Sequence, residues 1–340
     1  MKKAIKIIAF LIVLAIVLTG VCKIFKFKHV DGIYPLNVFY ELPKNSCDVM
    51  FFGTSHVFEG INPAVLWREH GIPAFALAGS SQPLWSTYYY MKEALKYQDP
   101  EVIVMDIDST YYKDEYQVED ELGTAYSRIV KNTIGLRLSL DKWEAVKVSS
   151  PPEYWLELML GFPTYHTRYS ELGTQDFSGY WANYPEHWKG YCEHTGHQYF
   201  SATDVSKATD RKPMSPKAEE WFYKILELCE EEDVELVLVS IPYCCTNIEQ
   251  YVYNTVEDIA KEEGIPLINC NTNRSLVGID YGTDMGDDQH LNYKGSTKMT
   301  HFIGQYLTEN YDLADRRGTS SIYDSWVENE AFDAEQHNLK

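Results

Sequence analysis

Short apolar runs alternate with amphipathic segments along most of the chain after residue 28. Five runs are rich in Val, Ile, Leu and Phe and are bounded by turn residues, as buried strands are. These five are Asp48–Phe52, Ala74–Ala78, Val102–Ile107, Val234–Ile241 and Pro266–Asn269. The segments with helical periodicity between and after them are Pro63–His70, Leu84–Tyr97, Ser215–Glu231, Asn247–Glu263 and Tyr293–Tyr311. This alternation predicts an α/β fold, in which helices cover both faces of a mostly parallel sheet.

The stretch from residue 109 to residue 213 interrupts this alternation. It is dense in aromatic residues and shows no clear strand, and its pattern predicts helices around Glu119–Ile134, Ser139–Val148 and Tyr154–Leu160. Because a long insertion after a strand end commonly carries function, we expect a helical cap over the site. The α/β domain then spans residues 29–320, and the polar residues 321–340 are predicted to form a mobile tail.

The N-terminal segment is basic and apolar. Ile7–Cys22 contains no charged residue, and three lysines lie on each side of it. This run is slightly shorter than the roughly 20 residues of a membrane span, but apolar residues continue to Phe27 and lysines can snorkel to the membrane surface. Residues 1–28 therefore predict an uncleaved anchor with the body outside the cytoplasm. A cleaved signal peptide is one alternative, and a lipid anchor on Cys22 is a weaker one.

The distribution of charge along the chain narrows the classes of partner that the body can bind. The chain has 340 residues and a formal charge of −20, but the first 28 residues hold six lysines and no acid. The remainder has 24 basic and 50 acidic residues, a formal charge of −26. A body this acidic does not attract phosphate polymers, so we expect no binding of nucleic acid. The 45% hydrophobic content is enough for a sizeable core.

Cysteine and histidine spacing gives no sign of a metal or cofactor. Six of the seven cysteines lie in the body, and none has the C-x-x-C spacing of a zinc or redox motif. No Gly-rich nucleotide loop is present either. We therefore expect no metal and no cofactor, while disulfides and buried thiols both remain open.

Residues that follow strands are the first candidates for chemistry, because open parallel sheets bind ligands beyond the carboxyl ends of their strands. Gly53-Thr54-Ser55-His56 follows the first predicted strand, and Asp287-Asp288-Gln289-His290 lies just before the last helix. A hydroxyl, an imidazole and a carboxylate are the nucleophile, base and orienting acid of acyl transfer. The sequence predicts a triad of Ser55, His290 and Asp287, with Asp288 as the alternative orienting acid.

These motifs resemble the conserved blocks of the SGNH/GDSL hydrolase superfamily. Gly53-Thr54-Ser55 is similar to the first block, whose serine is the nucleophile, and Asp287-x-x-His290 is similar to the last. Gly79 matches the glycine of the second block, whose N–H would form the oxyanion hole with that of Ser55. The third block differs, because Ile103-Val104-Met105-Asp106 stands in place of Gly-x-Asn-Asp. The resemblance implies a flavodoxin-like three-layer sandwich and an SGNH-type serine esterase or O-acyltransferase.

Within the superfamily, the pattern resembles the membrane-anchored members that act on cell-envelope polymers, including those of D-alanyl transfer to lipoteichoic acid and of alginate O-acetylation. This implies ester hydrolysis or transfer of an acetyl or D-alanyl group on an envelope polysaccharide or teichoic-acid-like acceptor. An integral-membrane O-acyltransferase would be the partner. The alternative is a non-catalytic accessory protein of such an acyltransferase, and the absent third-block asparagine favours it.

Four further side chains are candidates for substrate binding: His56, Gln82, His166 and Arg168. His56 directly follows the predicted nucleophile and can equally make a structural hydrogen bond. Gln82 is either a polar donor to the acyl group or a solvated loop residue. His166 and Arg168 belong to a polar and aromatic cluster in the insertion, which suits an anionic or sugar substrate or simple packing.

Overall fold

Five strands form one parallel sheet in this computed structural model, which describes residues 2–25, 33–114, 124–161, 169–170, 172–178 and 188–339. The strands are β1 (Val49–Phe52), β2 (Ala74–Ala76), β3 (Val102–Asp106), β4 (Glu235–Ser240) and β5 (Leu267–Asn269). Their order across the sheet is β2-β1-β3-β4-β5, and every neighbouring pair is parallel. This is one of the two common orders of doubly wound sheets. The predicted α/β class is confirmed.

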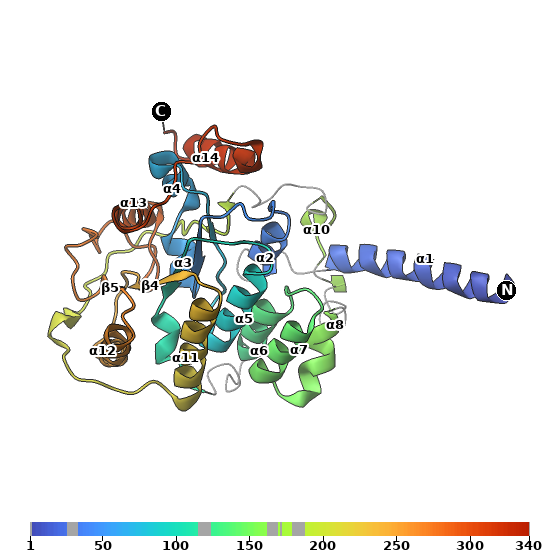
Figure 1. The fold of residues 1–340 in the computed structure, drawn as a ribbon, viewed down its shortest axis with the longest axis horizontal. Helices are drawn as coiled ribbons and strands as arrows, with labels where there is room; N and C mark the ends of the chain where they lie inside the picture. Colours follow the sequence, from blue (N-terminus) through green and yellow to red (C-terminus); the bar gives the residue numbers. More distant parts are fainter. Residues whose placement is uncertain are drawn as a thin grey trace.

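Both faces of the sheet are covered by helices (Figure 1). The helices on one face are α5 (Leu84–Ala94), α11 (Pro216–Glu231) and α12 (Asn247–Glu262). Those on the other face are α3 (Ser55–Gly60), α4 (Pro63–His70) and α13 (Tyr293–Asn310). Along β1, Met50 and Phe52 pack into the first core while Val49 and Phe51 pack into the second. Since successive side chains of a strand point to opposite faces, a strand buried on both sides is apolar throughout.

The described part of the insertion is helical and contains no strand. Its elements are η1 (Asp108–Tyr111), α6 (Thr124–Thr133), α7 (Leu140–Ser149), η2 (Pro152–Tyr154), α8 (Trp155–Leu160), α10 (Thr174–Ser178) and η5 (Val205–Lys207). Ala145 of α7 packs into the first core, beside α5 and α2 (Ile33–Phe39). On the other side of the sheet, Cys192 N–H donates to the Phe58 carbonyl of α3 at 2.6 Å. The insertion is therefore built onto both faces of the α/β body.

The C-terminal residues do not form a mobile tail, so this prediction is wrong. The elements there are η6 (Ser321–Tyr323) and α14 (Asp324–Gln336). Trp326 is fully buried, and its indole N–H donates to the Ala74 carbonyl at 2.9 Å. The buried carboxylate of Asp333 accepts from Asn62 Nδ2 at 2.8 Å. Polar composition misled the prediction, because a few buried contacts are enough to hold an otherwise polar helix against α4 and β2.

The N-terminal helix α1 (Lys2–Phe25) projects from the body near α8 and α10 (Figure 1). Its 24 residues correspond to about 36 Å at 1.5 Å per residue. The helix is long and apolar enough to cross a membrane, a test that a signal sequence also passes. The predicted position of the apolar segment is therefore confirmed, and its role as an uncleaved membrane anchor stays a prediction.

Candidate active site

The three residues of the predicted triad meet beyond the carboxyl end of β1. His290 Nε2 lies 2.8 Å from Ser55 Oγ, although 235 positions separate the two residues. His290 Nδ1 lies 2.9 Å from both carboxylate oxygens of Asp287. These are hydrogen-bond distances, so the imidazole bridges the hydroxyl and the carboxylate. With Nδ1–H donating to Asp287, Nε2 is the acceptor that faces the Ser55 hydroxyl.

The turn from β1 into α3 presents Ser55 as the first residue of a helix. Gly53 has a φ of +147°, and a Cβ there would lie 2.8 Å from the Cβ of Asp106, so only glycine fits. Thr54 caps α3 by accepting the N–H of His56 at 3.3 Å. The same Thr54 hydroxyl donates to Asp106 Oδ2 at 3.2 Å. The nucleophile's backbone is therefore tied to the end of β3.

Asp287 is oriented by its own loop. Its Oδ1 accepts the backbone N–H groups of Gln289 and His290, each at 2.8 Å. Burial acts to raise the pKa of Asp287, but the hydrogen bonds from His290 and Gln289 outweigh burial, and the net effect is a lowered pKa. Asp287 is therefore ionised at neutral pH and can stabilise an imidazolium. Asp288, the alternative orienting acid, is exposed, and its backbone carbonyl accepts from Cys244 N–H at 2.9 Å.

A buried ion-pair group fixes this loop to α13. Asp284 lies three residues before Asp287 and contacts Lys294 Nζ at 3.0 Å and Lys298 Nζ at 2.5 Å. Although burial opposes the charge, the hydrogen bonds from the lysines, Thr283 and the backbone lower the pKa of Asp284 to about 2. The loop that carries the acid and the base is thus held by charges that persist across the physiological pH range.

Comparison with known proteins does not assign this chain to a family. No family model matches the chain, and no curated protein matches it. The superfamily resemblance of the motifs stays a prediction, and the contacts among Ser55, His290 and Asp287 carry the functional argument.

Four thiols of the body are poor competitors of Ser55 as nucleophiles. All seven cysteines are free. Burial raises the pKa of Cys229, Cys245 and Cys270 to about 12, and that of Cys244 to about 11. A thiol attacks as its thiolate, which these pKa values suppress at neutral pH.

Sequence reasoning missed two side chains of the site. His194, near the end of the insertion, places Nε2 3.2 Å from Asp287 Oδ2, and its ring stacks with His290 at a centroid distance of 5.8 Å. Glu59 of α3 places Oε2 3.7 Å from His290 Nδ1. No motif or spacing sets His194 apart from the other histidines of the chain, so only the tertiary fold identifies it.

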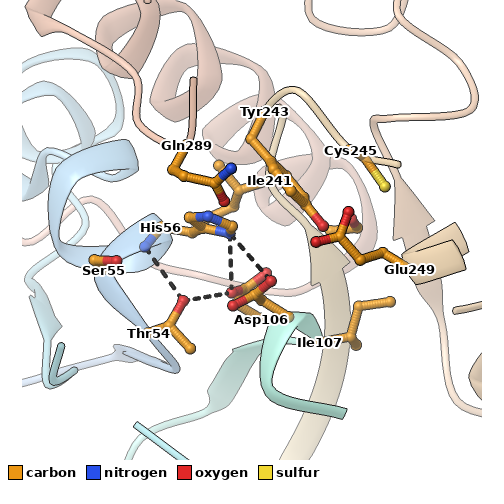
Figure 2. Close-up of polar contacts among 12 residues, drawn as sticks. Thr54, Ser55, His56, Asp106, Ile107, Ile241, Tyr243, Cys245, Glu249 and Gln289 are labelled. Carbon is orange, nitrogen blue, oxygen red and sulfur yellow. Dashed lines mark hydrogen bonds and ion pairs between the residues drawn. The ribbon is translucent and has the colours of Figure 1, made fainter. Parts of the chain in front are cut away.

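A second group of histidine and carboxylates lies behind the nucleophile (Figure 2). His56 Nδ1 is 3.8 Å from Asp106 Oδ2 and 3.8 Å from Asp108 Oδ1, beyond hydrogen-bond reach. Burial lowers the pKa of His56, while burial and the charge of Asp108 raise the pKa of Asp106 well above its usual range. The hydroxyls of Tyr112 and Tyr253 donate to Asp108 at 2.7 and 3.1 Å. This pocket therefore favours the uncharged forms of His56 and Asp106.

The four predicted substrate-binding residues have different outcomes. His56 is buried, and Gln82 is fully buried and donates to Thr87 Oγ1 at 3.1 Å. Substrate contact by either side chain stays a prediction. Burial favours the structural alternative for His56, and the alternative of a solvated loop residue is wrong for Gln82. His166 and Arg168 lie outside the described residues.

The two predicted oxyanion donors lie in different settings. The Ser55 N–H is the first of α3, where helix N–H groups have no partner within the helix. The Gly79 N–H donates to the Gly53 carbonyl at 3.3 Å, so it is engaged before any substrate binds. Asn132 of α6 lies directly beside Gly79, with its Nδ2 donating to the Ser80 carbonyl at 3.1 Å. Helix α6 of the insertion thus places the side-chain amide of Asn132 next to Gly79, the glycine of the predicted second block. The sequence did not predict this contact.

Two sets of described residues have donor atoms close enough to hold a metal ion, within 4.8 Å of one another. The first is Glu59, His194 and His290, where both ring nitrogens of His290 already bond within the triad. The second is His56, Asp106 and Asp108, where burial raises the pKa of Asp106 and Asp108 accepts two tyrosine hydroxyls. A metal would have to displace existing bonds in either set, so the expectation of no metal stays a prediction.

Proposed function

We propose that this chain is an SGNH-type serine esterase or O-acyltransferase that forms an acyl-enzyme on Ser55. The observation that carries the proposal is the continuous series of contacts from Ser55 Oγ through the His290 ring to Asp287, at 2.8 and 2.9 Å. A serine hydroxyl is a weak nucleophile, and an adjacent, oriented imidazole activates it. The strand order β2-β1-β3-β4-β5 agrees with the flavodoxin-like sheet of the superfamily.

In this mechanism, His290 Nε2 takes the proton of Ser55 as its Oγ attacks the ester carbonyl. The carboxylate of Asp287 stabilises the resulting imidazolium, and the oxyanion accepts from the N–H of Ser55 and from that of Gly79 once Gly79 leaves the Gly53 carbonyl. His290 then protonates the departing alcohol. Water or an acceptor hydroxyl attacks the acyl-enzyme by the same steps in reverse, which gives hydrolysis or transfer.

The substrate we propose is an O-acyl ester of a cell-envelope polymer, with an acetyl or D-alanyl group. A body that α1 anchors on the outer face of the cell membrane would reach such a polymer. In the transfer reaction, an integral-membrane O-acyltransferase would supply the acyl group. Glu59, Asp287 and Asp288 give the triad an acidic surrounding. This charge favours an acceptor without dense negative charge, because like charges repel at close range.

Labelling with a fluorophosphonate probe tests the nucleophile. We expect the full-length chain in detergent to be labelled, and Ser55→Ala to lose the label. Ser201→Ala, at an exposed serine of the insertion, is the matched control and should label like the wild type. A folded wild-type chain that stays unlabelled, or a Ser55→Ala variant that labels equally, would overturn the proposal and favour a non-catalytic accessory protein.

A further inference from the structure

The segment that carries His194 is tied to the body on both sides of this residue. Before it, Cys192 N–H donates to the Phe58 carbonyl at 2.6 Å. After it, Phe200 N–H donates to the Tyr281 carbonyl at 3.1 Å. The segment thus crosses from α3 to the loop before α13, and its backbone is fixed next to the triad.

The backbone also determines which ring nitrogen of His194 carries the proton. Gly196 N–H donates to His194 Nδ1 at 2.9 Å, so Nδ1 is an acceptor. In a neutral imidazole the other nitrogen then carries the hydrogen. This nitrogen, Nε2, lies 3.2 Å from Asp287 Oδ2. The nitrogen of His194 that carries the hydrogen in the neutral ring is therefore the one closest to the acid of the triad.

The ring of His194 lies flat over the backbone that leads into Asp287. A Cβ on Gly286 would lie 2.2 Å from His194 Nδ1, so a side chain at position 286 would displace the ring. The same ring also stacks with the ring of His290, at an interplanar angle of 18°. Asp287 is one-third exposed, and the His194 ring covers part of it from solvent.

The two oxygens of Asp287 are held by different parts of the chain. Oδ1 accepts two backbone N–H groups of its own loop, those of Gln289 and His290. Oδ2 bonds to the ring of His290 and lies 3.2 Å from Nε2 of His194. Without His194, Oδ2 would face water, and water would compete with His290 Nδ1–H for the carboxylate.

We propose that His194 is a positioning residue of the active site, whose Nε2–H faces Asp287 Oδ2 and whose ring stacks on His290, so that it holds the carboxylate that orients His290. This proposal rests on the acyl-transfer function proposed above. It also gives the insertion a role in the chemistry, because the segment that carries His194 must pack against the body for this side chain to hold Asp287.

The first test compares variants of the full-length chain in detergent by the rate of fluorophosphonate labelling and by hydrolysis of 4-nitrophenyl acetate. His194→Ala should lower both rates about 10-fold, the effect of losing one hydrogen bond to a charged group, through kcat and with KM unchanged. His194→Gln keeps an N–H donor and should recover to within about threefold of the wild type. His197→Ala, at an exposed histidine of the same segment, is the control and should match the wild type.

Two outcomes of this comparison would overturn the proposal. Equal losses in His194→Ala and His194→Gln with a raised KM would assign His194 to substrate binding. Unchanged rates in both variants would leave it without a role in positioning Asp287.

A second measurement does not depend on activity. In a chain labelled with ¹⁵N-histidine, the imidazole nitrogens of His194 should show the Nε2–H tautomer, and Asp287→Asn should shift its Nε2 signal more than the corresponding signal of His197. A neutral Nδ1–H tautomer would overturn the proposal even in a chain that labels at Ser55. The expected tautomer in a chain that never labels would support the contact while the enzymatic function failed.

Discussion

Two histidines beside Ser55 have similar partners and opposite properties. His290 is in hydrogen-bond contact with the nucleophile and with Asp287, at 2.8 and 2.9 Å, and remains partly exposed. His56 is buried, and its Nδ1 stands 3.8 Å from each of two carboxylates. Residue type alone therefore does not make a base. His290 is in hydrogen-bond contact with both the hydroxyl and the acid, which proton transfer requires, whereas burial lowers the pKa of His56 and disfavours its charged form.

The group of His56, Asp106 and Asp108 and the group of His290 and Asp287 are also held in place by different parts of the fold. His56 of α3 lies beside Asp106 at the end of β3 (Figure 2), and Asp108 of η1 accepts the hydroxyls of Tyr112 and Tyr253. His290 and Asp287 share one short loop, which α13 and the segment of His194 hold from either side. The buried group stabilises the turn at the nucleophile, and the loop group does the chemistry in the proposed mechanism.

Replacing each of these two histidines in turn should give the largest difference in hydrolysis rate. His290→Ala removes the base, and we expect a loss of about 10⁴-fold in the rate of 4-nitrophenyl acetate hydrolysis. His56→Gln removes a side chain outside the proton path and should cost less than about 10-fold. Both variants should be checked for folding by circular dichroism. Equal losses in two folded variants would contradict the different roles assigned to these histidines.

The next largest effect concerns the orienting acid. Asp287→Asn should lower the same rate by about 10³-fold, because an amide cannot hold His290 in the required tautomer and stabilise its charge. Asp288→Asn, at the exposed neighbouring acid, should stay within about twofold of the wild type. A larger loss in Asp288→Asn than in Asp287→Asn would move the orienting role by one residue.

The buried ion pairs beneath the loop should appear in stability. The folded-state pKa of Asp284, about 2, lies below its usual value of 3.8. Its stabilising effect is thus present above pH 4 and is lost as the pH falls through 2. Asp284→Asn should lower the free energy of unfolding by about 2 kcal/mol at pH 7, and the difference should shrink toward pH 2. Denaturant titrations followed by tryptophan fluorescence measure this, with the exposed Asp312→Asn as control; a difference that grows on acidification would contradict it.

The buried pocket should show the opposite pH dependence. Since the folded-state pKa of Asp106 is raised, its contribution to stability is complete below the unfolded value and declines as the pH rises toward the folded one. The neutral isostere in Asp106→Asn should remove this decline, which amounts to about 1 kcal/mol per pH unit within that window. The test is unfolding free energy against pH from 4 to 8. Parallel curves for variant and wild type would show that Asp106 is already ionised in the folded chain.

Most of the sheet was predictable because burial on both faces leaves an apolar run with few alternatives. The prediction of Val102–Ile107 differs from β3 by one residue, and that of Ala74–Ala78 differs from β2 by two. Ser55, His290 and Asp287 could be selected because ligand sites gather at strand ends and because few residue types activate a hydroxyl. The prediction of a tail at residues 321–340 failed, since the burial of Trp326 depends on β2 and α4, far away in sequence.

The sequence by itself determined the α/β class, the apolar N-terminal helix and the residues of the candidate triad, because local periodicity and strand-end chemistry require no knowledge of distant contacts. Only the tertiary structure decided that Asp287 rather than Asp288 faces His290, that His56 is enclosed, and that His194 reaches the triad from the insertion. Each of these depends on side-chain burial and on distances between segments far apart in the chain. The local sequence pattern does not encode them.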